Sequence, residues 1–152
     1  MPQYTDAWVA SMLSDPKPFP KDWRKKLALK DTRGGREASI WLDSLHGYSF
    51  KVTLRQNKFN RLNFGVFLFL FRPSSRSLIH LLRYDGKYHD HLNSIEQERI
   101  INEFHIHQFT ERYFEKYGFE KMDGWAYTTN RYQDLNGAFR CLIEDASLEL
   151  SE

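Results

Sequence analysis

Apolar and polar residues alternate with more than one period along this chain, and the change of period divides it into segments. Residues 4–13 (YTDAWVASML) carry apolar groups at helical spacing, with Thr5 or Asp6 placed to cap the first turn. The connector 15–20 (DPKPFP) is broken by prolines, so no helix can cross it. A second short helix is expected over residues 21–30.

The middle of the chain is typical of β-strands. Segments rich in β-branched and aromatic residues predict strands over residues 37–45, 48–56, 63–72, 77–85 and 103–112. His46 and Gly47, between the first two segments, predict a tight hairpin turn. Residues 63–72 (NFGVFLFLFR) are apolar at nearly every position, which indicates a central strand that is covered on both faces.

A final helix is predicted over residues 133–148, because apolar side chains recur there at helical spacing. Together these elements predict an α+β fold, in which N-terminal helices and a C-terminal helix flank an antiparallel sheet of about five strands. A length of 152 residues favours a single domain spanning residues 1–152. Within it we expect a basic, helical N-terminal extension over residues 1–36 and an α+β core over residues 37–148.

Composition and charge narrow the class of protein. There is no run of 18 apolar residues, so neither a membrane span nor a membrane partner is expected. The first dozen residues lack a signal-peptide pattern, and the single cysteine, Cys141, cannot form an intramolecular disulfide. We therefore expect a cytoplasmic protein. A net charge of +2 does not indicate a nucleic-acid binder, although the basic residues between Lys21 and Arg36 could contact phosphate or an acidic partner.

Side chains alternate across a strand, so each predicted strand divides its residues between two faces. The polar residues that fall opposite the core-facing set are Lys51, Thr53, Arg55, Arg83, Asp85, His105 and His107. A buried charge without a partner is costly, so the arginines must face water, pair with acids or line a groove. Ile79 and Leu81 fall in phase with Arg83, which predicts a groove that is apolar at one end, as ligand pockets are.

Short motifs follow one another through these positions. They are Trp41-Leu42-Asp43, His46-Gly47, Lys51-x-Thr53, Arg55, Leu82-Arg83-Tyr84-Asp85, His91-x-Asn93, His105-Ile106-His107, Tyr113 and Asp123-Gly124-Trp125-Ala126. In this order they resemble a family of small prokaryotic proteins known as a domain of unknown function. The resemblance covers residues 37–145 and implies an α+β domain with these polar residues at its site, but no activity. His46, Arg112 and a longer loop before Trp125 depart from the family pattern.

The His-x-His pair raises the question of a metal. Two imidazoles on one face of a strand can hold one ion. The residues that could complete a ligand set are His89, His91, Asp85 and Glu111. No strict three-ligand pattern is visible, however, and Arg55 and Arg83 would repel a cation. We therefore expect no metal and no other cofactor.

Metal-independent phosphodiester chemistry fits the same residues. Cleavage of RNA by this route needs a base, an acid and cations around the developing charge on phosphorus. The expected catalytic residues are His105, His107, His91, Arg83 and Arg55, because histidine titrates near neutral pH and arginine binds phosphate in bidentate fashion. The expected substrate-binding residues are Lys51, Thr53, Asp85, Asn93 and Tyr113, the last by stacking on a base.

Two interpretations follow from these residues. The first is a bacterial or phage protein of the toxin-antitoxin or phage-defence kind, which acts on nucleic acid, RNA above all, as a metal-independent ribonuclease with a His/Arg cleft. The second is a non-catalytic binding module, an antitoxin-like protein or an adaptor, which contacts a cognate protein or a nucleic acid. Arg83 and Asp85 would then form an ordinary ion pair. The sequence leaves both alternatives open, and the oligomeric state with them.

Overall fold

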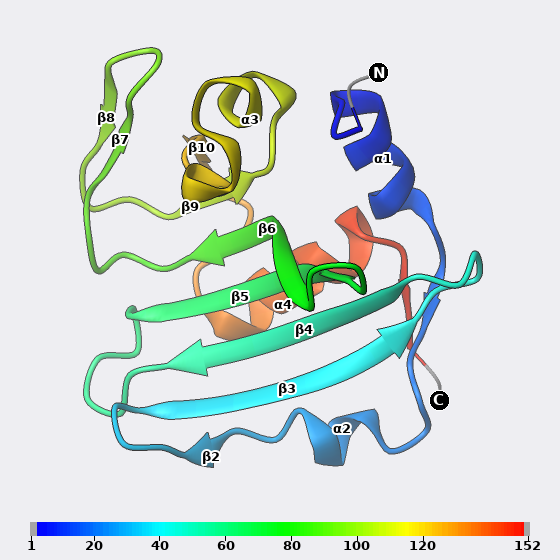
Figure 1. Ribbon diagram of the computed structural model, residues 1–152. Coiled ribbons are helices and arrows are strands. Elements are labelled where there is room, and N and C mark those ends of the chain that lie inside the picture. The colour runs from blue at the N-terminus through cyan, green and yellow to red at the C-terminus, as the bar shows by residue number, and fades with distance from the viewer. Residues whose placement is uncertain (1–2, 151–152) are drawn as a thin grey trace.

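The computed structural model describes residues 3–150, and a seven-stranded antiparallel sheet forms its centre (Figure 1). In spatial order the strands are β10 (Ala126–Thr128), β9 (His105–Gln108), β6 (Ser77–Asp85), β5 (Phe64–Arg72), β4 (Ser49–Gln56), β3 (Arg36–Asp43) and β2 (Lys30–Asp31). Every neighbouring pair is antiparallel. The predicted α+β class, with helices toward both ends of the chain, is confirmed.

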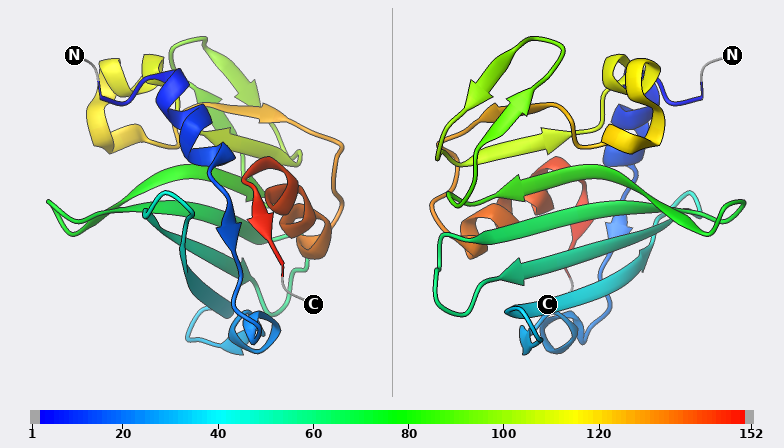
Figure 2. Two further views of the ribbon diagram at one scale, coloured as in Figure 1. Left: turned by 90° about the vertical axis from the view of Figure 1, so that its right-hand side faces the viewer. Right: turned by 60° about the vertical axis from the view of Figure 1, so that its left-hand side comes forward.

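The remaining elements surround this sheet. The helices are α1 (Asp6–Ser14), α2 (Trp23–Lys26), α3 (Glu111–Tyr117), the 3-10 helix η1 (Gly118–Lys121) and α4 (Leu135–Asp145). Two further strand pairs are the antiparallel hairpin β7 (His91–Asn93) with β8 (Glu98–Ile100), and the parallel pair β1 (Lys17–Pro18) with β11 (Leu148–Glu149). Figure 2 shows the β1–β11 pair on the same side of the sheet as α4. No helix formed by residues 3–150 is long and apolar enough to cross a membrane.

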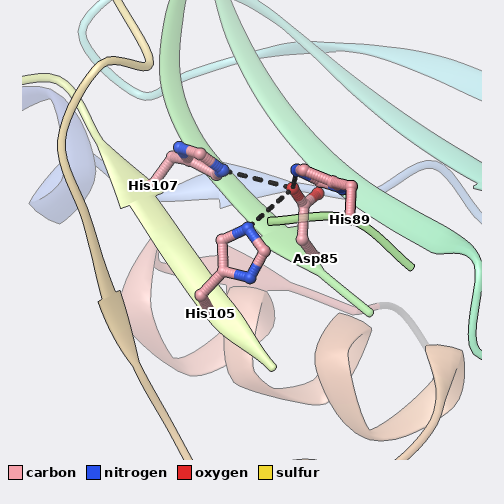
Figure 3. Close-up of side chains that lie close together, drawn as sticks. All are labelled: Asp85, His89, His105 and His107. Carbon is pink, nitrogen blue, oxygen red and sulfur yellow. Dashed lines mark hydrogen bonds and ion pairs between the residues drawn. The ribbon is translucent and has the colours of Figure 1, made fainter. Parts of the chain in front are cut away.

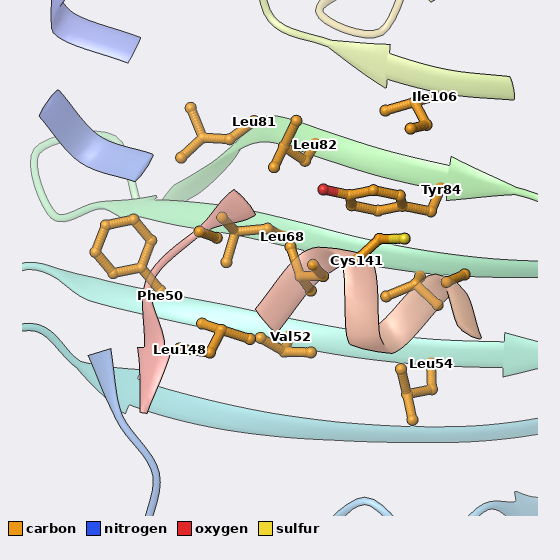
Figure 4. Packing of buried hydrophobic residues seen from close by; sticks show 14 of the residues in the cluster. Phe50, Val52, Leu54, Leu68, Leu81, Leu82, Tyr84, Ile106, Cys141 and Leu148 are labelled. Atoms are coloured by element: carbon orange, nitrogen blue, oxygen red, sulfur yellow. The ribbon is translucent and has the colours of Figure 1, made fainter. Parts of the chain in front are cut away.

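The hydrophobic core lies between α4 and one face of the sheet (Figure 4). Phe50 and Val52 of β4 and Leu68 of β5 are fully buried there, and Cys141 of α4 packs among them. Burying one large apolar side chain contributes about 1.5–3 kcal/mol, so this layer accounts for much of the driving force for folding. Asp134 caps α4 by accepting a hydrogen bond from the Gly137 amide.

The opposite face of β3, β4 and β5 is not covered by any helix of residues 3–150 (Figure 1). We call this side of the sheet the open face. The prediction that residues 63–72 form a central strand is confirmed, but the prediction that both faces are covered is wrong. Phe67, Phe69 and Phe71 point to the open face and are half-buried, because they pack against one another and their neighbours instead of under a helix.

Several predicted bounds and counts differ from the structure. The strand expected over residues 103–112 ends at Gln108, because the Thr110 side chain accepts a hydrogen bond from the Tyr113 amide and starts α3. The main sheet has seven strands where about five were expected, since the short edge strands β2 and β10 carry no readable period. Only four residues of the expected helix over 21–30 are helical.

A register shift in β6 changes which residues share a face. Leu68 pairs with Leu82 but Phe69 pairs with His80, so Leu81 is the extra residue of a β-bulge. Ile79 consequently lies on the core face, where it is fully buried. The prediction that Ile79 shares the face of Arg83 and forms the apolar end of a groove is therefore wrong.

The N-terminal segment is attached to the core by a buried lysine. The Lys17 ammonium donates hydrogen bonds to the backbone carbonyls of Met12, Asp15 and Ala146 at 2.7, 2.8 and 2.7 Å. The first of these carbonyls lies in the last turn of α1 and the last one at the end of α4. A single side chain therefore joins the two ends of the described chain.

This lysine makes stability depend on pH in the alkaline range. Burial lowers the pKa of Lys17 from 10.5 to about 8, although the negative charge of Asp15 opposes the shift. Between these values the unfolded chain binds more protons than the folded chain, so the free energy of unfolding should rise with pH. Urea unfolding should show a gain of about 1–2 kcal/mol between about pH 8 and about pH 9.5. A flat profile, or the same slope in Lys17→Met, would contradict this expectation.

Candidate functional site

Four polar side chains meet on the open face where β6 and β9 pair. The register places Asp85 opposite His105 and Arg83 opposite His107, so all four project from the same side of the sheet. Alternation along the two strands predicted this grouping, and Figure 3 shows Asp85, His105 and His107 pointing toward one another. His89, from the loop that follows β6, joins Asp85 and the two strand histidines. We call Asp85, His89, His105 and His107 the Asp85 cluster.

The carboxylate of Asp85 is the centre of this cluster. Its side chain is fully buried, and Oδ1 accepts a hydrogen bond from Arg83 Nε at 2.7 Å. Its Oδ2 faces three imidazole Nε2 atoms, those of His107 at 3.1 Å, His105 at 3.3 Å and His89 at 3.6 Å. Burial alone would raise the pKa of Asp85, but the adjacent imidazoles of His105 and His107 and the charge of Arg83 hold it well below its usual range.

Backbone carbonyls fix the orientation of the two strand histidines. His107 donates from Nδ1 to the carbonyl of Asp123 at 2.7 Å, and His105 donates from Nδ1 to the carbonyl of Glu103 at 2.8 Å. Both rings are buried. Because Nδ1 is used for the backbone contact, each ring presents Nε2 to Asp85.

A tyrosine fixes the backbone that carries the cluster. The hydroxyl of Tyr132 lies 2.8 Å from the carbonyl of Asp85 and 2.9 Å from the carbonyl of His105, one on each of the two paired strands. Tyr132 is buried, and burial raises the pKa of its hydroxyl, so it stays a hydrogen-bond donor at neutral pH. The distance between Asp85 and His105 is therefore set by the core as well as by the sheet.

Tyr88 connects the cluster to the arginines of the open face. Its hydroxyl accepts hydrogen bonds from Arg83 Nη2 and Arg55 Nη2, each at 2.9 Å. Its ring lies against His89, with centroids 4.3 Å apart. Tyr88 was not among the residues predicted for the site, and His89 was named only as one that could complete a metal-ligand set, because strand alternation gives no information about a loop. The sequence did hold a signal, since His89 and His91 form a second His-x-His pair.

The β7–β8 hairpin is held beside the cluster by His91 and Asn93. His91 Nε2 donates to Asn93 Oδ1 and to the carbonyl of Gly124, each at 2.9 Å. Asn93 also bonds the backbone amide and carbonyl of Ala126, at 2.8 and 2.7 Å. The ring of His91 lies 4.7 Å from that of His107 between centroids. Asn93 thus fixes the hairpin to β10, and His91 lies next to the cluster.

A cavity of about 230 Å³ opens beside these histidines. The charged and histidine side chains that line it are Arg83, His89, His91, His107, Lys121 and Asp123. Burial lowers the pKa of His89 and of His91, which keeps both rings neutral near pH 7. The cavity therefore combines imidazoles with two cations and one carboxylate.

Three of the predicted site residues form contacts elsewhere. The Lys51 ammonium lies over the ring of Trp41, and the Thr53 hydroxyl bonds Ser39 at 2.9 Å, both on the β3 side of the sheet. Tyr113 is buried in α3, where its hydroxyl donates to Glu96 at 2.6 Å. The structure thus brings together Arg83, Asp85, His105 and His107, with His91 adjacent and Arg55 joined through Tyr88, as described above.

Comparison of the chain with protein-family models, with curated proteins and with solved structures finds no match. The resemblance of its motifs to a prokaryotic family therefore stays a prediction.

Proposed function

We propose that this protein binds single-stranded nucleic acid, RNA in preference, across the open face and directs one phosphodiester into the cavity beside the Asp85 cluster. The observation that carries the proposal is a row of accessible aromatic rings and cations that runs along the sheet to the cavity. The aromatic rings would stack on the bases, and the cations would contact the phosphates.

The aromatic rings lie in adjacent rows of the sheet. Trp41, Lys51 and Phe69 occupy one row across β3, β4 and β5, and Phe67 lies in the next. The rings of Phe67 and Phe69 are stacked with centroids 5.6 Å apart, and Trp41 is 53% exposed. Bases of single-stranded RNA stack on such rings with little dependence on sequence, because every base has a π-face.

The cations lie between the rings and the cavity. The Arg83 guanidinium lies over the ring of Phe67 and is bonded to Asp85, Asp123 and Tyr88. Arg55 bonds Tyr88 through Nη2, and its other guanidinium nitrogens have no hydrogen bond or ion pair with a described residue, so they would be available to a ligand. A planar guanidinium suits phosphate, so Arg55 is the residue that we assign to the nucleic-acid backbone.

The size of the cavity limits what can enter it. A volume of about 230 Å³ is below the range of about 300–1,000 Å³ that is typical of pockets for drug-sized ligands. It accommodates a phosphate group with part of its sugar, and not a whole nucleotide. The bases would then remain outside on the aromatic rows, which is consistent with the position of Phe67 next to Arg83.

Burial limits which of the histidines can exchange a proton with a substrate. His105 and His107 are buried, with Nδ1 bonded to a backbone carbonyl and Nε2 facing Asp85, so neither can take a proton from a substrate without rearrangement. His89 and His91 line the cavity and are the imidazoles that a substrate can reach. The same inward contacts favour the second candidate, a binding module that holds RNA without cleaving it.

Replacing Trp41 by alanine is expected to weaken binding of a short single-stranded RNA about tenfold. Loss of one base–aromatic stack costs about 1–3 kcal/mol, and about 1.4 kcal/mol corresponds to a factor of ten. Trp41 is more than half exposed, so the substitution should leave the fold intact. Fluorescence anisotropy of a labelled RNA, at a stated salt concentration, measures the change.

Tyr127→Ala is the matched control for this experiment. Tyr127 is also an exposed aromatic residue, but it pairs with Ile106 and so points to the opposite face of the same sheet. Its removal should leave RNA affinity unchanged. Equal weakening by both substitutions, or no binding by the intact protein, would reject the proposal. Shortening of the bound RNA would identify an enzyme, and binding without shortening would identify the module.

A further inference from the structure

The spacing of ligand atoms in the Asp85 cluster matches that around a metal ion. One carboxylate oxygen and three imidazole nitrogens all lie within 4.8 Å of one another. The distances from Asp85 Oδ2 to the three nitrogens are 3.1, 3.3 and 3.6 Å. Zinc bound tetrahedrally at about 2.0–2.1 Å places neighbouring ligand atoms about 3.3 Å apart. The three distances lie on both sides of that value.

The hydrogen bonds of the two strand histidines also favour a metal ion in the Asp85 cluster. Carbonyl oxygens only accept, so His105 and His107 must carry their protons on Nδ1. In the neutral ring, Nε2 then directs a lone pair at the Asp85 carboxylate, and two acceptors at this distance repel each other. His105 Nε2 is fully buried and has no hydrogen-bond partner among the described residues. A cation between these atoms removes the repulsion.

Protonation of the Nε2 atoms would be the other way to remove the repulsion between the imidazoles and the Asp85 carboxylate. That arrangement would place two or three imidazolium charges around a carboxylate that already has Arg83 as its partner. Excess buried charge of one sign is strongly unfavourable. A single divalent ion satisfies the same four atoms with neutral imidazoles, and it matches how metal-binding histidines usually use their second nitrogen.

The arginines do not oppose a metal as the sequence alone suggested. Arg83 contacts Oδ1 of Asp85, whereas the imidazoles face Oδ2. Its Nη1 also pairs with Asp123 at 3.1 Å, so two carboxylates balance its charge. Arg83 thus orients the carboxylate from the side away from the three nitrogens, which is the position of an outer hydrogen-bond partner in metal sites.

We propose that Asp85 Oδ2 and the Nε2 atoms of His89, His105 and His107 form a binding site for one divalent transition-metal ion, with Zn²⁺ as the best fit. Three imidazole nitrogens with one carboxylate oxygen suit Zn²⁺ and also accept Co²⁺, Fe²⁺, Ni²⁺ and Mn²⁺. This inference departs from the expectation of a metal-free site. It goes beyond the proposed function, because the cluster can bind metal whether or not the open face binds RNA.

The test uses the full-length protein after chelator treatment and dialysis. Calorimetric titration with ZnCl₂ should give one ion per chain, and elemental analysis of the dialysed complex should agree. CoCl₂ should produce the intense visible absorption of tetrahedral Co²⁺. His89→Ala should weaken zinc binding at least about tenfold, and Asp85→Asn more strongly. His89 is in a loop and about one third exposed, so its variant should fold, as circular dichroism would check.

His46→Ala is the matched control, since His46 is 70% exposed and lies outside the cluster, paired with Asp15. Its zinc affinity should equal that of the unmodified chain. Less than about 0.1 equivalent of any of the five metals bound to the unmodified protein would overturn the inference, as would unchanged affinity in His89→Ala and Asp85→Asn. RNA anisotropy with the chelator-treated protein separates the two proposals, because binding of RNA without any metal uptake would reject only the metal site.

Discussion

Replacing Arg83 by methionine is expected to lower the free energy of unfolding by about 3–5 kcal/mol. Methionine keeps much of the volume of the side chain but removes the hydrogen bond to Asp85 Oδ1, so a fully buried carboxylate loses its cationic partner. The contacts with Asp123 and Tyr88 are lost at the same time. Urea unfolding of the chelator-treated protein, followed by circular dichroism, measures the effect.

Arg55→Met is the control for this experiment. Arg55 is on the same face and bonds the same tyrosine hydroxyl, but it has no carboxylate partner in the described structure. Its loss should cost less than about 1 kcal/mol. Zinc should reduce the loss in Arg83→Met if the ion replaces the missing positive charge beside Asp85. Equal costs for the two substitutions would show that Asp85 does not depend on Arg83.

Strand period was enough to predict which residues of β6 and β9 converge. Neighbouring antiparallel strands bring residues of like phase to the same face, so Arg83, Asp85, His105 and His107 had to meet once these two strands paired. The period of a strand predicts on which face of the sheet a residue lies, but not which strand is the neighbour. Lys51 and Thr53 have the right phase and lie on the same side, yet β5 separates their strand from β6.

Features that depend on long-range pairing could not be predicted from the period. The bulge at Leu81 is set by how β5 and β6 align, and it moves Ile79 to the core and His80 to the open face. His89 enters the cluster from a loop, where no alternation applies. The sequence predicted no metal because it shows no strict three-ligand pattern and because Arg55 and Arg83 belong to the same set of residues. The structure shows instead that Arg83 contacts a different oxygen from the one that the imidazoles face.

The open face and the Asp85 cluster are two parts of one surface. Arg83 is the link, since its guanidinium lies over Phe67 of the aromatic rows and bonds the carboxylate of the cluster. A phosphate bound near Arg55 would lie close to Tyr88, whose ring contacts His89. Binding on the open face and metal binding are therefore expected to influence each other through Tyr88.

Lys17→Met tests a second charged group in the interior and is expected to lower the free energy of unfolding by about 2–4 kcal/mol. Each buried carbonyl that loses its donor costs about 1–3 kcal/mol, and three short contacts, to Met12, Asp15 and Ala146, are lost together. The variant also avoids the cost of burying the ammonium. The lowered pKa of Lys17 corresponds to a cost of about 3 kcal/mol near neutral pH, so the loss of the three contacts is offset in part.

The balance between these two effects decides the sign of the change in Lys17→Met. Because three acceptors outweigh one desolvated charge, we expect destabilisation near pH 7, where the ammonium is charged. Lys51→Met is the control, since its ammonium lies over Trp41 on the open face and its loss should change stability by less than about 0.5 kcal/mol. A variant at position 17 as stable as the control would mean that water or a shift of the backbone satisfies the carbonyls, and that the β1–β11 pairing and apolar contacts hold the N-terminal segment without this side chain.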